Sequence, residues 1–327
     1  MHSMSSIPIP VQTATPPNLR PLNIFRDLPQ VADLIELCFS STMDEDGQSY
    51  LQQMRRASRD NSFLKWANSA IEGASVPLSG IVWEENGSIV GNVSLIIHNY
   101  KGRKITLIAN VATHPDYRRR GIGRALTERA MLQAKQKGTQ ELWLQVREDN
   151  PIAIKIYRDL GFIERARRTT YQTYPHSLQA PIANDITITH MKPQFWMLQR
   201  HWLSQAHPDE LSWYWHWDWN RLSPGLRMWL HRFFIEFDIR QWAATKNGKL
   251  LAIVSWLGTT RPTDLLWAAA APDGEPTGLK SALEAACHEL ADQRRLTIEY
   301  PAGEMVEAIQ AAGFRPQRTL LWMCATS

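Results

Sequence analysis

The chain has 327 residues, a length that predicts two domains of ordinary size. Hydrophobic residues make up 44% of it and charged residues 21%, which permits a packed core and excludes disorder throughout the chain. The formal net charge of +4 is too small for a protein that coats nucleic acid, so no nucleic-acid partner is expected. No run of about 18 apolar residues occurs, so we expect no membrane span.

The N-terminal segment and the cysteines favour a cytoplasmic protein. Residues 1–18 are rich in Ser, Pro and Thr and lack the basic start and apolar core of a secretory signal, so we expect a disordered leader. Cys38, Cys287 and Cys324 are odd in number and far apart. They fit neither a disulfide framework nor a metal-ligand spacing, so we interpret them as reduced thiols and expect no metal site.

The first half, 19–175, is predicted to begin with a short strand, two helices, a hairpin and a fourth strand. A long helix, a strand, a further helix and a last strand follow. The hairpin turns at Asn86-Gly87, because these residue types accept the positive φ angles of a tight turn. In chain order the predicted elements cover residues 20–25, 28–39, 49–59, 80–84, 89–97, 104–112, 121–136, 141–146, 151–160 and 165–174.

The second half, 186–327, is predicted to repeat this order after a linker at 176–185 that contains Pro181 and Asn184. Prolines and glycines at matching places in the two halves are 157 or 152 residues apart, which indicates a duplicated domain. The alternative is that similar prolines and glycines occur at these places by chance. The matching pairs are Pro115 and Pro272, Gly121 and Gly278, and Gly161-Phe162 and Gly313-Phe314. The predicted elements are a strand at 186–191, helices to about 237, strands at 240–245, 249–256 and 264–270, a helix at 278–293, a strand at 296–300, a helix at 304–311 and a strand at 319–324.

The stretch from Asn110 to Leu126 contains the candidate ligand-binding motif. A strand ends there, a turn rich in Arg and Gly follows, and a helix begins. The first N–H groups of a helix lack backbone partners, and the helix dipole is positive at that end, so the turn suits a pyrophosphate. A dinucleotide site would need a third glycine where Leu126 stands, and a Walker loop would need Gly-Lys-Ser/Thr.

Arg118-x-x-Gly121-x-Gly123 resembles the acyl-CoA loop of the GNAT superfamily of N-acetyltransferases. Asn150-Pro-Ile-Ala-Ile-Lys-Ile-Tyr157-Arg-Asp-Leu-Gly-Phe162 is similar to the second signature of that superfamily. The span 107–162 also resembles the ribosomal-protein alanine acetyltransferase branch. The resemblance implies an α/β (α+β) protein of two tandem GNAT-like domains, each a mixed, mostly antiparallel twisted sheet with helices on both faces.

The resemblance also implies an activity, the transfer of acetyl from acetyl-CoA to an amine of a small molecule or peptide by direct attack in a ternary complex. Tyr157 would protonate the leaving thiolate. The alternative is a non-catalytic acyl-CoA-binding or scaffold protein. In either case we expect a monomer with an internal pseudo-dimer or a homodimer. The implied cofactor-binding residues are Val111, Ala112, Thr113, Arg118, Arg119, Arg120, Gly121, Ile122, Gly123, Arg124 and Asn150.

Each role has a simpler alternative. Asn150 can cap the helix that follows it, Tyr157 can be an ordinary residue of an amphipathic helix, and the arginines can form a solvated face. The general base is also missing from its usual places, because Gln145 and Leu107 stand where relatives have Glu. The remaining candidates are Glu148, His114 and His98.

The second half departs from the motifs and is expected to keep the fold without the cofactor site. The replacements expected from the glycine and proline spacing are Glu275 for Arg118, Lys280 for Gly123, Ala302 for Asn150 and Ile309 for Tyr157. Eleven of the 14 tryptophans lie at or after Trp196. For the segment 213–219 we favour packing between domains over an acceptor-binding surface.

Overall fold

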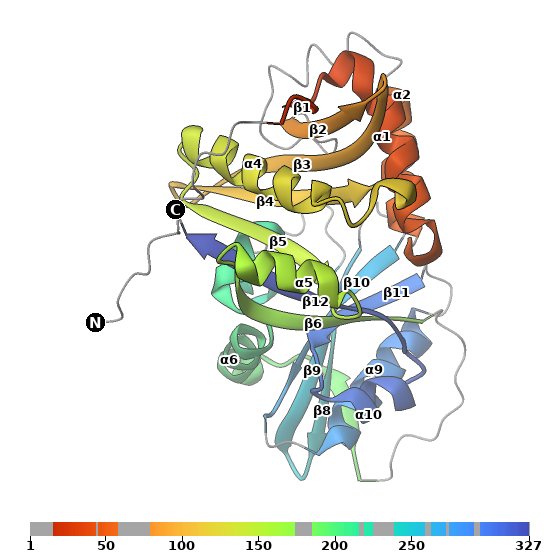
Figure 1. Ribbon diagram of the computed structural model, residues 1–327. Helices are drawn as coiled ribbons and strands as arrows, with labels where there is room; N and C mark the ends of the chain where they lie inside the picture. Colours follow the sequence, from red (N-terminus) through yellow and green to blue (C-terminus); the bar gives the residue numbers. More distant parts are fainter. Residues whose placement is uncertain are drawn as a thin grey trace. The chain divides into compact units, whose positions relative to one another are not determined.

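The computed structural model describes residues 16–43, 45–57, 79–173, 185–215, 219–224, 239–258, 263–272, 275–290 and 295–326 (Figure 1). The contacts divide these residues into two units. Unit 1 takes in the described residues up to Arg165 and those from Leu321 onward, and unit 2 those from Ala166 to Leu320. The predicted leader and linker lie outside the described residues, apart from residues 16–18 and 185.

In unit 1 the strands follow the order β1-β2-β3-β4-β5, and the last residues of β12 lie beside β5. The pairs β1–β2, β2–β3 and β3–β4 are antiparallel, whereas β4 and β5 are parallel. The elements are β1 (Leu19–Pro21), α1 (Ile24–Phe39), α2 (Glu45–Ala57), β2 (Ser79–Glu85), β3 (Ser88–Tyr100), β4 (Arg103–Thr113), α4 (Ile122–Gln136), β5 (Glu141–Arg147) and α5 (Pro151–Asp159), with short 3-10 turns at 40–42 and 115–117.

Two apolar clusters show that helices cover both faces of the unit 1 strands. Ile81 packs with the cluster of α4 and α5, whereas its neighbour Val82 packs with the cluster of α1 and α2. Consecutive strand residues point to opposite faces, so the two clusters lie on opposite sides. The predicted mixed, mostly antiparallel sheet with helices on both faces is confirmed.

Local chemistry explains the element boundaries. The hairpin turns at Asn86 and Gly87, which have φ angles of 52° and 77°. Helix α1 begins at Ile24 rather than Leu28, because the Asn23 side chain accepts hydrogen bonds from the backbone N–H groups of Phe25 and Arg26. The strand predicted at 20–25 was therefore too long.

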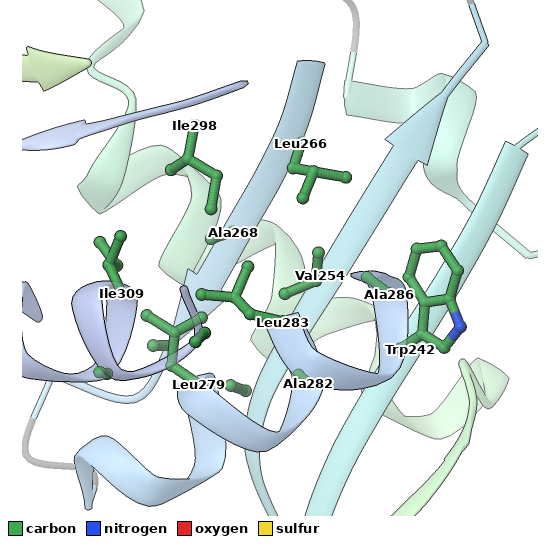
Figure 2. Packing of buried hydrophobic residues seen from close by; sticks show 14 of the residues in the cluster. Trp242, Val254, Leu266, Ala268, Leu279, Ala282, Leu283, Ala286, Ile298 and Ile309 are labelled. Atoms are coloured by element: carbon green, nitrogen blue, oxygen red, sulfur yellow. The ribbon is translucent and has the colours of Figure 1, made fainter. Parts of the chain in front are cut away.

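In unit 2 the strand order is β6-β11-β10-β9-β8-β7, with β10 and β11 parallel and the other neighbours antiparallel. Figure 2 shows Leu279 and Leu283 of α9 packed against Val254 and Leu266 of the strands. The elements are β6 (Ile163–Thr173), β7 (Thr187–His190), α6 (Trp196–Ala206), α7 (Ser212–Trp215), β8 (Ile239–Lys246), β9 (Lys249–Leu257), β10 (Thr263–Ala270), α9 (Pro276–Glu289), β11 (Arg295–Pro301), α10 (Val306–Ala311) and β12 (Arg315–Thr326), with 3-10 turns at 193–195, 209–211 and 219–222.

The contacts divide the chain earlier than the predicted boundary after residue 175. From Arg168 onward β6 pairs with β11. The second half of β6 therefore belongs to unit 2, although it precedes the predicted linker in the sequence. The end of β12 belongs to unit 1, so the chain returns from unit 2 to unit 1 at Leu321.

Two tryptophans of the segment 213–219 pack inside unit 2, and packing between domains stays a prediction. Trp215 and Trp219 pack against a cluster of unit 2 itself, which includes Trp202 and Trp267. Trp213 is fully buried. Residues 216–218 lie outside the described part of the chain. Trp215 and Trp219 therefore contribute to the core on the α6 side of unit 2.

Candidate active site

Strands β4 and β5 pair only over part of their length. Their parallel register ends at Ile108 and Leu144, although β4 continues to Thr113 and β5 to Arg147. On the other side, β4 stays paired with β3 up to Thr113. The segment Val111–Thr113 therefore has one edge engaged with β3 and one edge beyond the β5 pairing, where an extended ligand can add hydrogen bonds.

A bulge in β4 lies within this diverging part. Ala109 and Ala112 face Ser94 and Asn92, so β4 has one residue more than β3 here, and Asn110 takes a left-handed φ of 52°. The side chain of Asn92 donates to the carbonyl of Asn110 at 2.9 Å, and the Asn110 amide donates to Tyr50 Oη at 2.8 Å. These polar groups fix the bulge.

Sequence reasoning missed this polar set. Its members are Tyr50, Asn92, Ser94 and Asn110. The available signal was the pair Asn92 and Ser94, which interrupt the apolar run from Ile89 to Ile97; both prove to be fully buried.

The turn after β4 leads into α4 through a left-handed glycine. Gly121 is the N-cap with a φ of 77°, and no side chain caps the helix. The N–H groups of its first turn are therefore left for solvent or a ligand. A Cβ added to Gly123 would meet nothing closer than Thr113 Oγ1 at 3.7 Å, so open space adjoins this residue.

The four predicted arginines differ in their partners. Arg119 is exposed, has a φ of 62°, and makes no hydrogen bond or ion pair with any described residue. The side chain of Arg118 turns back and its Nε donates to the carbonyl of Thr113 at 3.4 Å. Arg120 lies 4.7 Å from the Tyr117 ring centroid, and Arg124 pairs with Glu128 at 2.9 Å. All four bring positive charge to one turn.

Tyr157 lies on α5 and is 7% exposed. Its ring makes an edge-to-face contact with Phe162, and burial raises the pKa of its hydroxyl to about 12. Tyr157 belongs to the same apolar cluster as Ile122, and Val111 packs against that cluster. Tyr157, Ile122 and Val111 thus contribute to one and the same apolar cluster of unit 1.

The remaining predicted residues have local partners. Asn150 caps α5 by accepting from the Ala153 N–H at 3.1 Å, which is the simpler alternative. His114 Nδ1 accepts from the Asp116 N–H at 3.3 Å. Leu107 is buried and Gln145 half-buried, while Glu148 is exposed and His98 lies on β3. The role of Asn150 toward a cofactor and the identity of a base stay predictions.

Unit 2 has a shorter connection at the equivalent place. Eight residues, 114–121, join β4 to α4, but only five, 271–275, join β10 to α9. The 157-residue spacing therefore misaligned the helices. Glu275, the N-cap of α9, corresponds to Gly121, and Thr277 rather than Lys280 corresponds to Gly123.

Gly278, which the 157-residue spacing had matched to Gly121, has a different role. A Cβ on Gly278 would lie 2.5 Å from Leu251 Cβ, so this glycine allows close packing inside α9 rather than opening the helix.

The alignment at the second motif holds for one residue and fails for another. The N–H of Phe314 bonds the carbonyl of Ile309 as the N–H of Phe162 bonds that of Tyr157, so the apolar Ile309 occupies the tyrosine position. Ala302 lies in the turn after β11, and Met305 rather than Ala302 is the N-cap of α10.

Comparison with known proteins finds relatives for the first part of the chain. A model of the acetyltransferase (GNAT) family matches residues 31–162. Over this span, which is less than half of the chain, the sequence is similar to that family. The chain is 46% identical to the ribosomal protein bS18-alanine N-acetyltransferase of Escherichia coli over 66 residues, which are 20% of this chain and 43% of that protein. It is 32% identical to an uncharacterized N-acetyltransferase of Methanocaldococcus jannaschii over 44% of this chain and 60% of that one. The alignments thus span less than two thirds of these relatives.

Solved structures extend the GNAT likeness to the tandem arrangement of the fold. A GCN5-related N-acetyltransferase from Sphaerobacter thermophilus aligns with a TM-score of 0.54 and 13% identity, over 96% of this chain and 97% of that one. A GCN5-related glucosamine N-acetyltransferase region of a fungal β-N-acetylglucosaminidase aligns with a TM-score of 0.52 and 14% identity, over 96% of this chain and 39% of that one. Both units are GNAT-like folds.

No helix among the described residues has both the length and the apolarity to cross a membrane. Those residues also contain no cluster of three His, Cys, Asp or Glu side chains arranged to hold a metal ion.

Proposed function

We propose that unit 1 transfers an acetyl group from acetyl-CoA to an amine acceptor by direct attack in a ternary complex, with Tyr157 as general acid. The divergence of β4 and β5 beyond Ile108 and Leu144, next to an uncapped helix start, carries the proposal. In this reaction the amine nitrogen forms a bond to the acetyl carbon, the C–S bond breaks, the sulfur takes a proton, and the amine releases one.

The residues of unit 1 fit a phosphate-bearing acyl carrier. The free edge of Val111–Thr113 would hold an extended amide-containing arm, and the N–H groups of Ile122 and Gly123 with the unpaired Arg119 would hold phosphates. The carrier would supply a thioester, an acyl group activated toward an amine.

Tyr157 would hold the proton for the leaving sulfur at its hydroxyl oxygen. With a pKa of about 12 the hydroxyl is protonated at neutral pH, but it is a weaker acid than an ordinary tyrosine and can donate only to a strong base such as a thiolate forming beside it. The same burial makes a tyrosinate costly, so proton transfer has to accompany cleavage of the C–S bond rather than precede it.

Replacing Tyr157 by Phe tests the role. We expect kcat to fall at least about 100-fold, because general acids contribute roughly 10²–10⁴-fold, with the Kd for coenzyme A changed less than about twofold. Tyr171→Phe, at a buried tyrosine of unit 2, is the matched control and should keep wild-type kcat. Unchanged kcat in Tyr157→Phe would show that another group donates the proton.

A second candidate is a non-catalytic acyl-CoA-binding protein. Gln145 and Leu107 favour it, because neither side chain can take a proton from the incoming amine. Thiol release from acetyl-CoA with a panel of small amines and peptides distinguishes the two. Affinity for coenzyme A without thiol release would support the binding protein, and turnover would support the enzyme and identify the acceptor class.

A further inference from the structure

Asn110 of β4 carries a hydrogen-bond acceptor that the proposed reaction does not use. Its amide nitrogen donates to Tyr50 Oη at 2.8 Å and to Ser94 Oγ at 3.3 Å. Its side-chain oxygen, Oδ1, accepts no hydrogen bond from any described residue. Asn110 is half-buried and its Oδ1 is not enclosed, so this oxygen remains accessible to a ligand.

Hydrogen bonds fix the orientation of the Asn110 amide. Tyr50 is half-buried on α2 and packs against the apolar cluster of α1 and α2. Ser94 is fully buried and also accepts from the amide nitrogen of Asn92, which donates in addition to the backbone carbonyl of Asn110. Both the backbone and the side chain of Asn110 are therefore held in place, so little conformational freedom is lost when a ligand binds to Oδ1.

Asn110 lies next to the strand edge that is proposed to hold the acyl carrier. Strand β4 stops pairing with β5 at Ile108, and the free edge comprises Val111–Thr113. Asn110 stands between these two points, within the bulge of β4. An amine that reaches its side chain would therefore meet the carrier beside the segment that binds it.

The side chain of Asn110 lies on the face of unit 1 opposite to Tyr157. Val93 packs with the cluster that contains Tyr157, so its neighbour Ser94 points to the other face. Asn110 contacts Ser94 and Tyr50 on that other face, where α1 and α2 pack. An acceptor held by Asn110 would approach the thioester from the side away from the proposed proton donor, so the two groups would not compete for space.

An amide oxygen suits a neutral amine. It accepts hydrogen bonds but cannot take up a proton at ordinary pH, so the amine has to arrive uncharged. An amine N–H that donates to Oδ1 leaves the nitrogen lone pair free for attack. The nitrogen then forms a bond to the acetyl carbon, the C–S bond breaks, the sulfur takes a proton from Tyr157, and the amine proton passes to solvent.

We infer that Asn110 is a further catalytic residue, whose Oδ1 accepts a hydrogen bond from a neutral acceptor amine and aims the nitrogen lone pair at the acetyl carbon. Tyr50 is the positioning residue that holds the Asn110 amide. The inference rests on the proposed acetyl transfer and names the group that binds its nucleophile. A purely structural role predicts instead that glycine serves equally well, because it also accepts the left-handed φ of 52°.

The test replaces Asn110 by Gly and by Asp, which both tolerate a positive φ. Thiol release from acetyl-CoA by the full chain is measured with glycinamide, tyramine and Nα-acetyl-lysinamide, and the fastest of the three serves as the probe. In Asn110→Gly, kcat/KM for the amine should fall at least about tenfold, whereas KM for acetyl-CoA should change less than about twofold. Asn110→Asp retains an acceptor oxygen and should recover most of the lost kcat/KM.

Asn86→Gly is the matched control, because Asn86 has the same φ of 52° in an exposed turn. It should keep the wild-type kcat/KM. Tyr50→Phe removes the hydrogen-bond acceptor of the Asn110 amide and should lower kcat/KM for the amine less than Asn110→Gly does. Combined with Asn110→Gly it should add no further loss, because Tyr50 acts through Asn110. Tyr50→Phe keeps the test decisive if Asn110→Gly does not fold.

Thermal denaturation identifies the variants that fold. Full activity in folded Asn110→Gly or Tyr50→Phe, an equal loss in Asn110→Asp and Asn110→Gly, or a matching rise in KM for acetyl-CoA would overturn the inference, because the residue would then only shape the bulge. Coenzyme A binding by the wild type without thiol release to any of the three amines would instead overturn the proposed acetyl transfer, and this inference with it.

Discussion

Single residues in unit 1 show how burial and charge are balanced. Asp27 of α1 is 1% exposed, and its carboxylate accepts from Arg20 at 2.6 and 3.0 Å, from the Asn23 N–H at 2.7 Å and from Arg26 at 2.9 Å. Burial alone would raise the pKa of Asp27, but these hydrogen bonds outweigh it and the pKa lies below its usual value.

This balance predicts a pH-dependent stability. The folded pKa of Asp27 is below the unfolded value of about 3.9, so its contribution is present above that value and is lost as the pH falls through the folded pKa. Asp27→Asn should lower the free energy of unfolding by about 1.5–3 kcal/mol at neutral pH, the range for hydrogen bonds to charged groups. Urea denaturation at neutral and strongly acidic pH measures the difference.

The control is Asp33→Asn, at an exposed carboxylate that pairs with Arg55 on the surface. It should cost less than about 1 kcal/mol at either pH. A cost of Asp27→Asn that is the same at neutral and acidic pH would contradict the assignment of the effect to the ionised carboxylate.

The sequence could not predict the partners of Asp27, although it did predict other single residues. Asn86 and Gly87 determine their own turn through their φ angles, and Asn150 caps the helix that follows at once. The contacts of Asp27 with Arg20 and Arg26 depend on the geometry with which β1 leads into α1. The polar set around Asn92 likewise joins residues from two strands and a helix, and no local pattern shows which side chains meet there.

At the scale of elements, the sequence predicted nearly every helix and strand, because periodicity and turn residues are local. The match between the two halves was less accurate. The spacing of Gly121 and Gly278 was taken to mark the same helix start, whereas one caps α4 and the other packs against Leu251. Sequence spacing does not show that the connection before α9 is three residues shorter than the connection before α4.

The proposed cofactor site lies at the start of α4. A substitution there should weaken the binding of coenzyme A without lowering the stability of the protein. Gly123→Leu places a side chain in open space and replaces the residue with the second-lowest helix propensity, so thermal stability should be equal or higher. The side chain would occupy space where a phosphate would approach, so we expect the Kd for coenzyme A to rise at least about tenfold, or 1.4 kcal/mol.

The matched control is Thr277→Leu, at the equivalent position of α9 in unit 2. It should leave the affinity for coenzyme A unchanged, because the shorter connection and Glu275 at the helix start do not suit a pyrophosphate. Isothermal titration with coenzyme A and thermal denaturation provide both readouts. Equal weakening by the two variants would place cofactor binding in both units.

At the scale of the whole chain, the C-terminal strand is the feature that the sequence could not reveal. The short apolar run from Leu320 to Cys324 predicts that 319–324 is a strand, but not which sheet it joins. In the structure Leu321, Met323 and Ala325 lie in the core cluster of unit 1, and Trp322 makes an edge-to-face contact with Trp143 of β5. The last strand of the chain thus completes the unit to which its first strands belong.

This connection predicts that a change near the C-terminus loosens the N-terminal unit. Leu321→Ala removes a 1%-exposed side chain from the core of unit 1, and we expect a loss of about 2–5 kcal/mol in its stability. Hydrogen exchange of β5 amides around Trp143 should accelerate in the full-length variant, because β5 is the neighbour of β12. Leu296→Ala, in the core of unit 2, removes the same group and should leave β5 exchange near the wild-type rate. Faster β5 exchange in Leu296→Ala but not in Leu321→Ala would mean that the strand stabilises unit 2 instead.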